Sequence, residues 1–316
     1  MNDKLWSSMI KYSLVLVSAV VITACGGGGG GEPSGGGNTT ISPTADFSSK
    51  TDAEITKMTG TAFSLGDEAS SFDENLNATS SSSPSIPKAG ISSKLVPGVC
   101  SNQSNGGSVD VSAGASVSSG TFTFVNCDIN SVTLDGQFIL AASNIATFET
   151  RITLNTFSVT TGGTTKLTFS GTMHEFSSYA NGIETGRVSS NGGKLNFTIV
   201  SPSFSDDIEI SDFYESYTDD TNLGLESSDY SYIVNSTDFG GSLSIKTTQT
   251  IKHNNLDTYP YAGQFVVTGS NNSSVRVEIL GDGSANGLVR VEIDKDGDGV
   301  YESSNDVLWP EFELKS

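Results

Sequence analysis

The sequence has few of the residues on which common catalytic and nucleic-acid sites are built. Its 316 residues include two histidines and three cysteines, and 16 Lys and Arg stand against 36 Asp and Glu, for a formal net charge of −20. Nucleic-acid backbones are bound by clustered Lys and Arg, so we expect no nucleic-acid partner. The chain contains no Gly-x-Ser-x-Gly and no Gly-Lys-Ser/Thr motif, and neither histidine lies in a metal or nucleophile motif. These absences predict a protein that is not an enzyme.

The N-terminal apolar run is too short to cross a membrane. It covers residues 12–22, whereas a spanning helix needs roughly 20 apolar residues. Lys4 and Lys11 precede it, and the small residues Thr23 and Ala24 follow it. This order of basic residues, apolar run and small residues is that of a secretory signal. We predict a cleaved signal segment over residues 1–24.

A cysteine, Cys25, directly follows the predicted signal. The stretch Ile22-Thr23-Ala24-Cys25 resembles the lipobox of bacterial lipoproteins. The resemblance implies that the Cys25 thiol is acylated, with palmitate among the acyl groups, and that Cys25 becomes the new N-terminus. Residue 26 is Gly rather than the Asp that retains such proteins in the inner membrane, which implies the outer membrane, facing either the periplasm or the cell surface.

The segment after Cys25 predicts a flexible tether. Residues 25–50 are rich in Gly, Ser, Thr and Pro and contain almost no apolar side chains. Such a segment would hold a folded part away from the membrane to which the acyl anchor attaches it.

The two remaining cysteines, Cys100 and Cys127, are expected to pair with each other. No histidine or third cysteine lies near them in the sequence to complete a zinc site. Disulfides persist in the oxidising compartments outside the cytoplasm. We predict a Cys100–Cys127 disulfide that stabilises the fold by about 3 kcal/mol.

One helix is predicted ahead of the strands, over residues 51–65. Thr51 and Glu54 have the spacing of a capping box, and apolar residues recur at steps of three and four from Ile55 to Leu65. Gly60 weakens this helix, so we expect it to be short and to pack on the β domain after it. The chain then divides into a signal (1–24), a tether (25–50), the short helix with a Ser/Pro-rich linker (51–98) and an antiparallel β domain (99–316).

Short runs of alternating apolar and polar residues fill the chain from about residue 97 onward. Asp135-Gly136 predicts a two-residue hairpin turn, Asn191-Gly192-Gly193 predicts another turn, and residues 307–314 predict a final strand. The turns leave no room for crossover helices, so the strands should be antiparallel. We predict a mainly β fold with one large, strongly curved antiparallel sheet or half-barrel, and a two-sheet β-sandwich as the alternative.

The overall plan of the chain resembles that of known lipoproteins. Lipobox, Gly/Ser tether, single helix and antiparallel sheet together are similar to uncharacterised bacterial outer-membrane lipoproteins and, more loosely, to the open-barrel lipoprotein carrier families. The resemblance concerns architecture alone. The function that we predict is a non-enzymatic binding or structural module of the envelope, which holds a hydrophobic or peptide ligand on its curved sheet.

The densest acidic motif, over residues 294–302, predicts a Ca²⁺ site. Oxygen ligands at alternate positions, with Gly for the tight turn, are typical of Ca²⁺ loops. Asp294, Asp296 and Asp298 would ligate through their carboxylates, Val300 through its carbonyl, and Glu302 directly or through water. The segment before the motif has the pattern of a strand. The motif therefore resembles the Ca²⁺-binding hairpins of extracellular proteins more than an EF-hand. The same residues also form an Asp/Gly-rich turn without a metal, and the sequence leaves both possibilities open.

A second acidic segment, residues 205–220, supports a remote alternative, an acidic-site hydrolase. Its acids alternate with aromatic residues, and paired carboxylates carry out glycoside hydrolysis. The same alternation is typical of a strand with a charged outer face. A surface adhesion or carbohydrate-binding module with a Ca²⁺-ordered terminal hairpin is the other alternative function. The acids are Asp206, Asp207, Asp212, Glu215, Asp219 and Asp220.

Overall fold

The computed structural model describes residues 42–77, 94–95, 100–102, 106–113, 119–129, 132–142, 148–161, 165–201, 204–254, 257, 259–281, 283–284 and 286–312. The predicted signal, Cys25 and most of the predicted tether lie outside these residues. Within the described ranges, no helix has both the length and the apolar character that crossing a bilayer requires.

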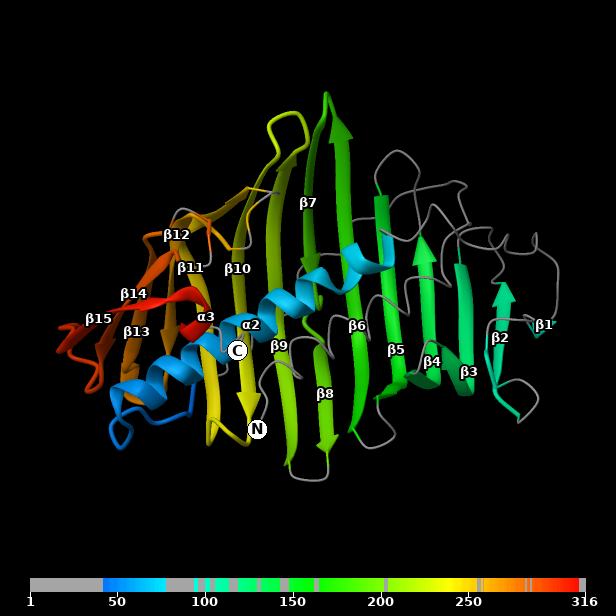
Figure 1. Cartoon of the computed structure of the whole chain (residues 1–316), viewed down its shortest axis with the longest axis horizontal. Helices are drawn as coiled ribbons and strands as arrows, with labels where there is room; N and C mark the ends of the chain where they lie inside the picture. Colours follow the sequence, from blue (N-terminus) through cyan, green and yellow to red (C-terminus); the bar gives the residue numbers. More distant parts are fainter. Residues whose placement is uncertain are drawn as a thin grey trace.

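The strands in the described part of the chain form a single open sheet of fifteen antiparallel strands, which confirms the predicted mainly β fold with one large sheet rather than the two-sheet sandwich. Neighbours in the sheet are neighbours in the sequence, except that β7 and β8 lie end to end between β6 and β9 (Figure 1). The strands are β1 (Lys94–Leu95), β2 (Ser108–Ala113), β3 (Ser119–Ile129), β4 (Val132–Ala142), β5 (Phe148–Thr161), β6 (Thr165–Ala180), β7 (Ile183–Ser189), β8 (Lys194–Ser201), β9 (Phe204–Asp220), β10 (Leu225–Ser236), β11 (Gly241–Asn254), β12 (Ala262–Thr268), β13 (Ser274–Ile279), β14 (Leu288–Asp294) and β15 (Ser303–Leu308).

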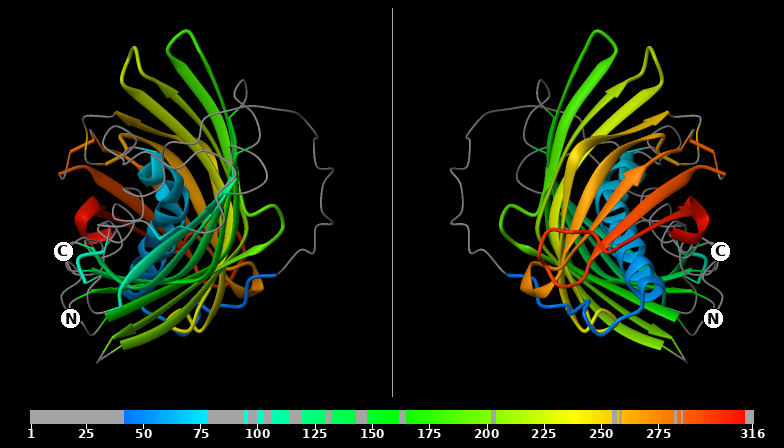
Figure 2. Two further views of the ribbon diagram at one scale, coloured as in Figure 1. Left: turned by 90° about the vertical axis from the view of Figure 1, so that its right-hand side faces the viewer. Right: turned by 90° about the vertical axis from the view of Figure 1, so that its left-hand side faces the viewer.

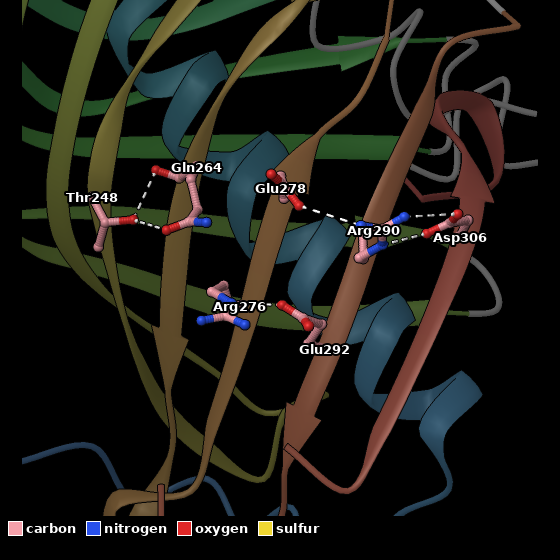
Figure 3. Close-up of polar contacts among 7 residues, drawn as sticks. All are labelled: Thr248, Gln264, Arg276, Glu278, Arg290, Glu292 and Asp306. Carbon is pink, nitrogen blue, oxygen red and sulfur yellow. Dashed lines mark hydrogen bonds and ion pairs between the residues drawn. The ribbon is translucent and has the colours of Figure 1, made fainter. Parts of the chain in front are cut away.

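The sheet curves around helix α2 (Asp52–Asn77), which lies on its concave face (Figure 2). Alternate residues of β13 and β14, such as Val277 and Val291, are fully buried toward the helix. Their neighbours carry charges on the outer face, where Arg276 Nε lies 2.6 Å from Glu292 Oε2 (Figure 3). A sheet with one apolar and one polar face needs a cover on the apolar side only, and α2 supplies part of that cover.

Helix α2 begins where the capping box predicts and runs farther than predicted. Thr51 N donates to Glu54 Oε2 at 2.8 Å, and Glu54 N donates to Thr51 Oγ1 at 3.3 Å. The helix has 26 residues and crosses the concave face from the side of β13 to the side of β5 and β6 (Figure 1). It continues past the predicted end at Leu65 because its following residues also pack on the sheet.

Gly66 shows why the sequence pattern understates this helix. A Cβ at Gly66 would overlap the ring of Tyr232 on β10. The Tyr232 hydroxyl donates to the carbonyls of Ala62 and Phe63, at 3.0 and 3.2 Å. A residue that weakens an isolated helix is therefore what lets this helix approach the sheet closely.

The end of the sheet near the start of α2 is closed by helix α3 (Trp309–Phe312), where the sequence predicted the last strand. Trp309 is fully buried, stacks on Tyr259 with ring centroids 5.6 Å apart, and lies 6.2 Å from Phe63 of α2. Burial of these rings at the open end outweighs continuation of β15, so the predicted strand over 307–314 is wrong at Trp309–Phe312, and its last two residues lie outside the described part of the chain.

The structure confirms the predicted disulfide and contradicts one predicted hairpin turn. Cys100 and Cys127 form the predicted disulfide, with Cα atoms 5.1 Å apart. The predicted hairpin at Asp135-Gly136 is wrong, because β4 runs straight through it with a register irregularity against β5. Gly136 has φ +102° and lies so close to the Thr156 backbone that a Cβ would overlap it. The glycine allows a bulge rather than a turn.

Candidate functional site

The predicted Ca²⁺ motif forms the loop between β14 and β15. Glu302 N donates to Ile293 O at 3.0 Å, so the two strands remain paired up to the loop. Gly297 and Gly299 have φ +76° and +87°, in the left-handed region that glycine adopts without steric cost. These two residues let the chain turn sharply enough for its acidic side chains to converge.

The four predicted carboxylates come together. Asp294, Asp296, Asp298 and Glu302 each offer one oxygen, and these oxygens all lie within 4.8 Å of one another. Ca²⁺ binds oxygens at about 2.3–2.6 Å, so ligands on opposite sides of the ion are roughly 5 Å apart. The spacing in the loop therefore fits a shared cation. Asp294 is 2 % exposed, whereas the other three carboxylates are at the surface.

Backbone hydrogen bonds hold these carboxylates in place. Asp294 accepts from Gly297 N at 2.7 Å and from Gly299 N at 3.0 Å, one bond to each carboxylate oxygen. Asp298 Oδ1 accepts from the N–H of Val300 at 2.7 Å. A carboxylate offers about four acceptor positions, so these carboxylates can still bind a cation while they accept these hydrogen bonds. The same bonds also stabilise the turn itself, with or without a metal.

The negative charge of the loop has no compensating ion pair among the residues that the structure describes. Lys295 belongs to the loop, yet its ammonium points away, to Asp52 Oδ1 at 2.7 Å and to Lys50 O at 3.0 Å. Like charges at this separation repel one another. A divalent cation would remove that repulsion.

The loop also joins the two ends of the fold. The contact with Lys295, followed by that with Ser303, lowers the pKa of Asp52, which lies in the first turn of α2. A Cβ on Gly297 would overlap the carbonyl of Asn271 in the short helix η2 (Ser270–Asn272). The loop between β14 and β15 therefore lies where the segment before α2, the first turn of α2 and the last hairpin meet.

The acids of residues 205–220 are spread along β9, and the two outermost, Asp206 and Asp220, lie at opposite ends of the strand. Asp206 is buried and accepts hydrogen bonds from the side chains of Ser236 and Thr237. Asp220 caps the turn at the other end of the strand. At about 3.3 Å per residue these two carboxylates lie roughly 45 Å apart, whereas glycoside hydrolysis needs a pair within about 5–10 Å.

One polar cluster on β6, β7 and β9 was not predicted from the sequence. The Tyr217 hydroxyl donates to Glu175 Oε1 at 2.9 Å and lies 3.3 Å from Glu184 Oε1. Burial, reinforced by the charge of Glu175, raises the pKa of this hydroxyl. Glu184 is also paired in register with Asp219. Only cross-strand pairing brings these residues together, so local sequence carries no signal for the cluster.

The concave face offers little empty space beside the far end of α2. A cavity of about 10 Å³ lies between α2, β5, β6 and β8, which is room for about one water molecule. A hydrophobic ligand does not fit there while α2 is in place. The lining residues are Ala69, Leu154, Phe169, Ser170, Met173, Leu195, Asn196 and Phe197.

No protein-family model, curated protein or solved structure matches this chain. Its function is therefore inferred from the residues of the chain itself.

Proposed function

We propose that this chain is a lipid-anchored, non-enzymatic binding or structural module of the cell envelope, held on the outer membrane through Cys25 and ordered at its last hairpin by Ca²⁺. The observation that carries the Ca²⁺ proposal is the convergence of Asp294, Asp296, Asp298 and Glu302 without a basic partner among the described residues. The Val300 carbonyl supplies a further ligand in this proposal.

Calcium has a structural role in this proposal. The loop ends β14, begins β15 and contains Lys295, whose ammonium binds the first turn of α2. An ion that binds only the folded state stabilises it by RT ln(1 + [L]/Kd). For an extracellular-type Kd of about 10⁻⁴–10⁻³ M, about 5 mM Ca²⁺ adds roughly 1–2 kcal/mol.

Thermal unfolding tests the Ca²⁺ site. Residues 25–316 with Cys25→Ser are unfolded in EDTA, in about 5 mM Ca²⁺ and in the same concentration of Mg²⁺. We expect Ca²⁺ to raise the midpoint by roughly 2–8 °C, and Asp296→Asn/Asp298→Asn to abolish the rise. In EDTA this variant should be at least as stable as the parent, because it removes repulsion.

A matched control separates binding from general charge screening. Asp207→Asn/Asp212→Asn changes the net charge equally at exposed positions of β9 and should keep the full Ca²⁺ response. An unchanged midpoint in the parent chain would contradict the Ca²⁺ site. An equal Ca²⁺ response in both double variants would contradict it too.

The lipid anchor has its own test. Cys25→Ala should move the chain from the membrane fraction to the soluble fraction and abolish acyl labelling, because the thiol is the proposed attachment point. Continued labelling of this variant would refute the anchor.

The binding role uses the concave face of the sheet, since its buried side chains form the large apolar surface of the molecule. Helix α2 covers part of this surface, and the cavity beside its far end is small. A ligand that bound beneath α2 would have to replace the helix.

A further inference from the structure

The open sheet ends in two edge strands, and the two edges differ. β1 has two residues, and so short a strand offers few backbone groups to another chain. β15 has six residues, and within the described ranges it pairs only with β14. It contains no proline and no lysine, the residues that commonly protect an exposed strand edge. The free edge of β15 is therefore the better place for another strand to pair.

Alternate residues of β15 present their backbone groups at this free edge. The residue directly after β15, Trp309, donates its N–H to Gly287 O at 3.1 Å, and the register of β15 against β14 has no irregularity. In an antiparallel pair, residues that bond to the neighbouring strand alternate with residues whose N–H and C=O point the other way. The residues that point to the free edge are Ser304, Asp306 and Leu308.

The outer face beside this edge carries charges of alternating sign from strand to strand (Figure 3). Glu278 on β13, Arg290 on β14 and Asp306 on β15 are paired in register and form one row. Arg290 Nη1 lies 3.7 Å from Glu278 Oε2, and Arg290 Nε donates to Asp306 Oδ1 at 2.9 Å. The Asp306 side chain is still 42 % exposed. A further strand would continue the row with a Lys or Arg opposite Asp306, because opposite charges on facing residues stabilise a pair of strands.

An apolar row lies next to the charged row. Leu280 N donates to Leu288 O at 2.9 Å, and Leu288 is paired in register with Leu308. Leu280 and Leu288 are among the exposed large apolar side chains of the molecule. A further strand with an apolar residue opposite Leu308 would extend this row. In an antiparallel strand that residue comes two positions before the basic one, so both side chains lie on the outer face.

We propose that the free edge of β15 is a docking site for an extended peptide, which adds an antiparallel strand and places an apolar residue opposite Leu308 and a Lys or Arg opposite Asp306. Read from its N-terminus, the peptide has the pattern apolar-x-basic. Main-chain hydrogen bonds supply affinity in such strand addition, and alternate side chains supply specificity. The net charge of −20 also favours a basic partner. This inference goes beyond the proposed function and depends on neither the Ca²⁺ site, the lipid anchor nor the concave face.

The chain itself contains a segment with the required pattern. β14 reads Leu-Val-Arg-Val-Glu-Ile from Leu288 onward, and it pairs Leu288 with Leu308 and Arg290 with Asp306 on the other side of β15. A peptide of this sequence can place the same side chains opposite the same partners at the free edge. It is therefore a suitable probe.

The test measures binding by fluorescence anisotropy. The probe is a labelled peptide of residues 287–293 with both ends capped, and the receptor is residues 25–316 with Cys25→Ser. We expect saturable binding. Methylation of the peptide N–H at Arg290, which faces β15 in the proposed pairing, should weaken binding at least about tenfold because it removes a main-chain donor. Methylation at Val291, whose N–H faces away from β15, should leave the affinity nearly unchanged.

Two receptor variants test the edge itself. Ser304→Pro removes an N–H that faces the free side and no bond to β14, and proline is tolerated at such edge positions. We expect this variant to keep its cooperative unfolding transition and to lose peptide binding. Asp306→Asn keeps every N–H and removes the charge opposite the basic residue. It should weaken the parent peptide roughly two- to fivefold and should not change the affinity of an Arg290→Gln peptide.

Three results would overturn the proposal. The first is no saturable binding of the parent peptide. The second is equal affinity of the peptides methylated at Arg290 and at Val291, which would show adhesion without strand addition. The third is a parent peptide that binds the Asp306→Asn receptor as tightly as the unchanged one. The Ca²⁺ dependence of the unfolding midpoint is measured without peptide, so failure of the edge site is distinguishable from failure of the Ca²⁺ site.

Discussion

The contact between Gly66 and Tyr232 makes Gly66→Ala a substitution with opposite effects in the peptide and in the protein. Alanine favours an isolated helix over glycine by about 1 kcal/mol. In the folded chain its Cβ overlaps the Tyr232 ring, and overpacking of this kind costs about 1–3 kcal/mol. A displaced ring also loses the hydroxyl bonds to Ala62 and Phe63, at about 1 kcal/mol each.

Taken together, these magnitudes predict that Gly66→Ala destabilises the protein by roughly 2–4 kcal/mol. For a chain of this size the thermal midpoint should fall by roughly 4–16 °C. Thermal unfolding monitored by circular dichroism measures the change, and peptides of residues 50–77 with and without the substitution measure helicity. The peptide should gain helicity where the protein loses stability.

Thr61→Ala is the matched control, because it raises helix propensity by a few tenths of a kcal/mol away from Tyr232. It should leave the midpoint unchanged or slightly higher. A Gly66→Ala protein as stable as the parent would refute the reasoning. That result would mean that α2 does not pack against β10 closely enough for a methyl group to matter.

Three further substitutions test other contacts of the fold. Cys100→Ser/Cys127→Ser opens a loop with a sequence separation of 27 and should lower the unfolding free energy in urea by about 3.5 kcal/mol; an unchanged midpoint would contradict this. Asp206→Ala leaves three donors around the turn after β10 without an acceptor and should cost about 2–4 kcal/mol, whereas exposed Asp207→Ala should stay within about 0.5 kcal/mol. Burial lowers the pKa of His174, so the folded state favours the neutral ring. The contribution of the neutral His174 ring to the free energy of unfolding should be complete above about pH 6.5. It should be lost as the pH falls below that value. His174→Gln should remove that part of the pH dependence, and an identical pH profile would show that His174 does not contribute.

The sequence predicts well wherever a feature is made by neighbours in the chain. The capping box at Thr51 and Glu54 fixes the start of α2, and alternating residues indicate the strands from β10 to β14. The carboxylates of residues 294–302 converge because glycines within the same short loop turn the chain. The Cys100–Cys127 disulfide also follows from local counting, since no other partner was available.

Predictions failed where a distant residue decides the outcome. The helical pattern in the sequence stops at Leu65, whereas α2 continues past Gly66, which packs against Tyr232. Tyr232 lies on a strand far along the chain, so local sequence carries no signal for this contact. Asp135-Gly136 has the composition of a turn, yet its extended course follows from the backbone of β5. Trp309 begins a helix because Tyr259 and Phe63 bury it at the open end of the sheet.

The order of the strands sets an order of assembly. Apart from β8, each described strand pairs with the one before it, so the sheet can grow hairpin by hairpin with little loop-closure entropy at each step. The bond from Lys295 Nζ to Lys50 O, by contrast, joins residues 245 positions apart. During synthesis α2 therefore emerges before the strands that receive it, and its first turn is secured only when the last hairpin has formed. A chain truncated before residue 295 would leave both the helix and the concave face without that closure, so the Lys295 contact marks completion of folding.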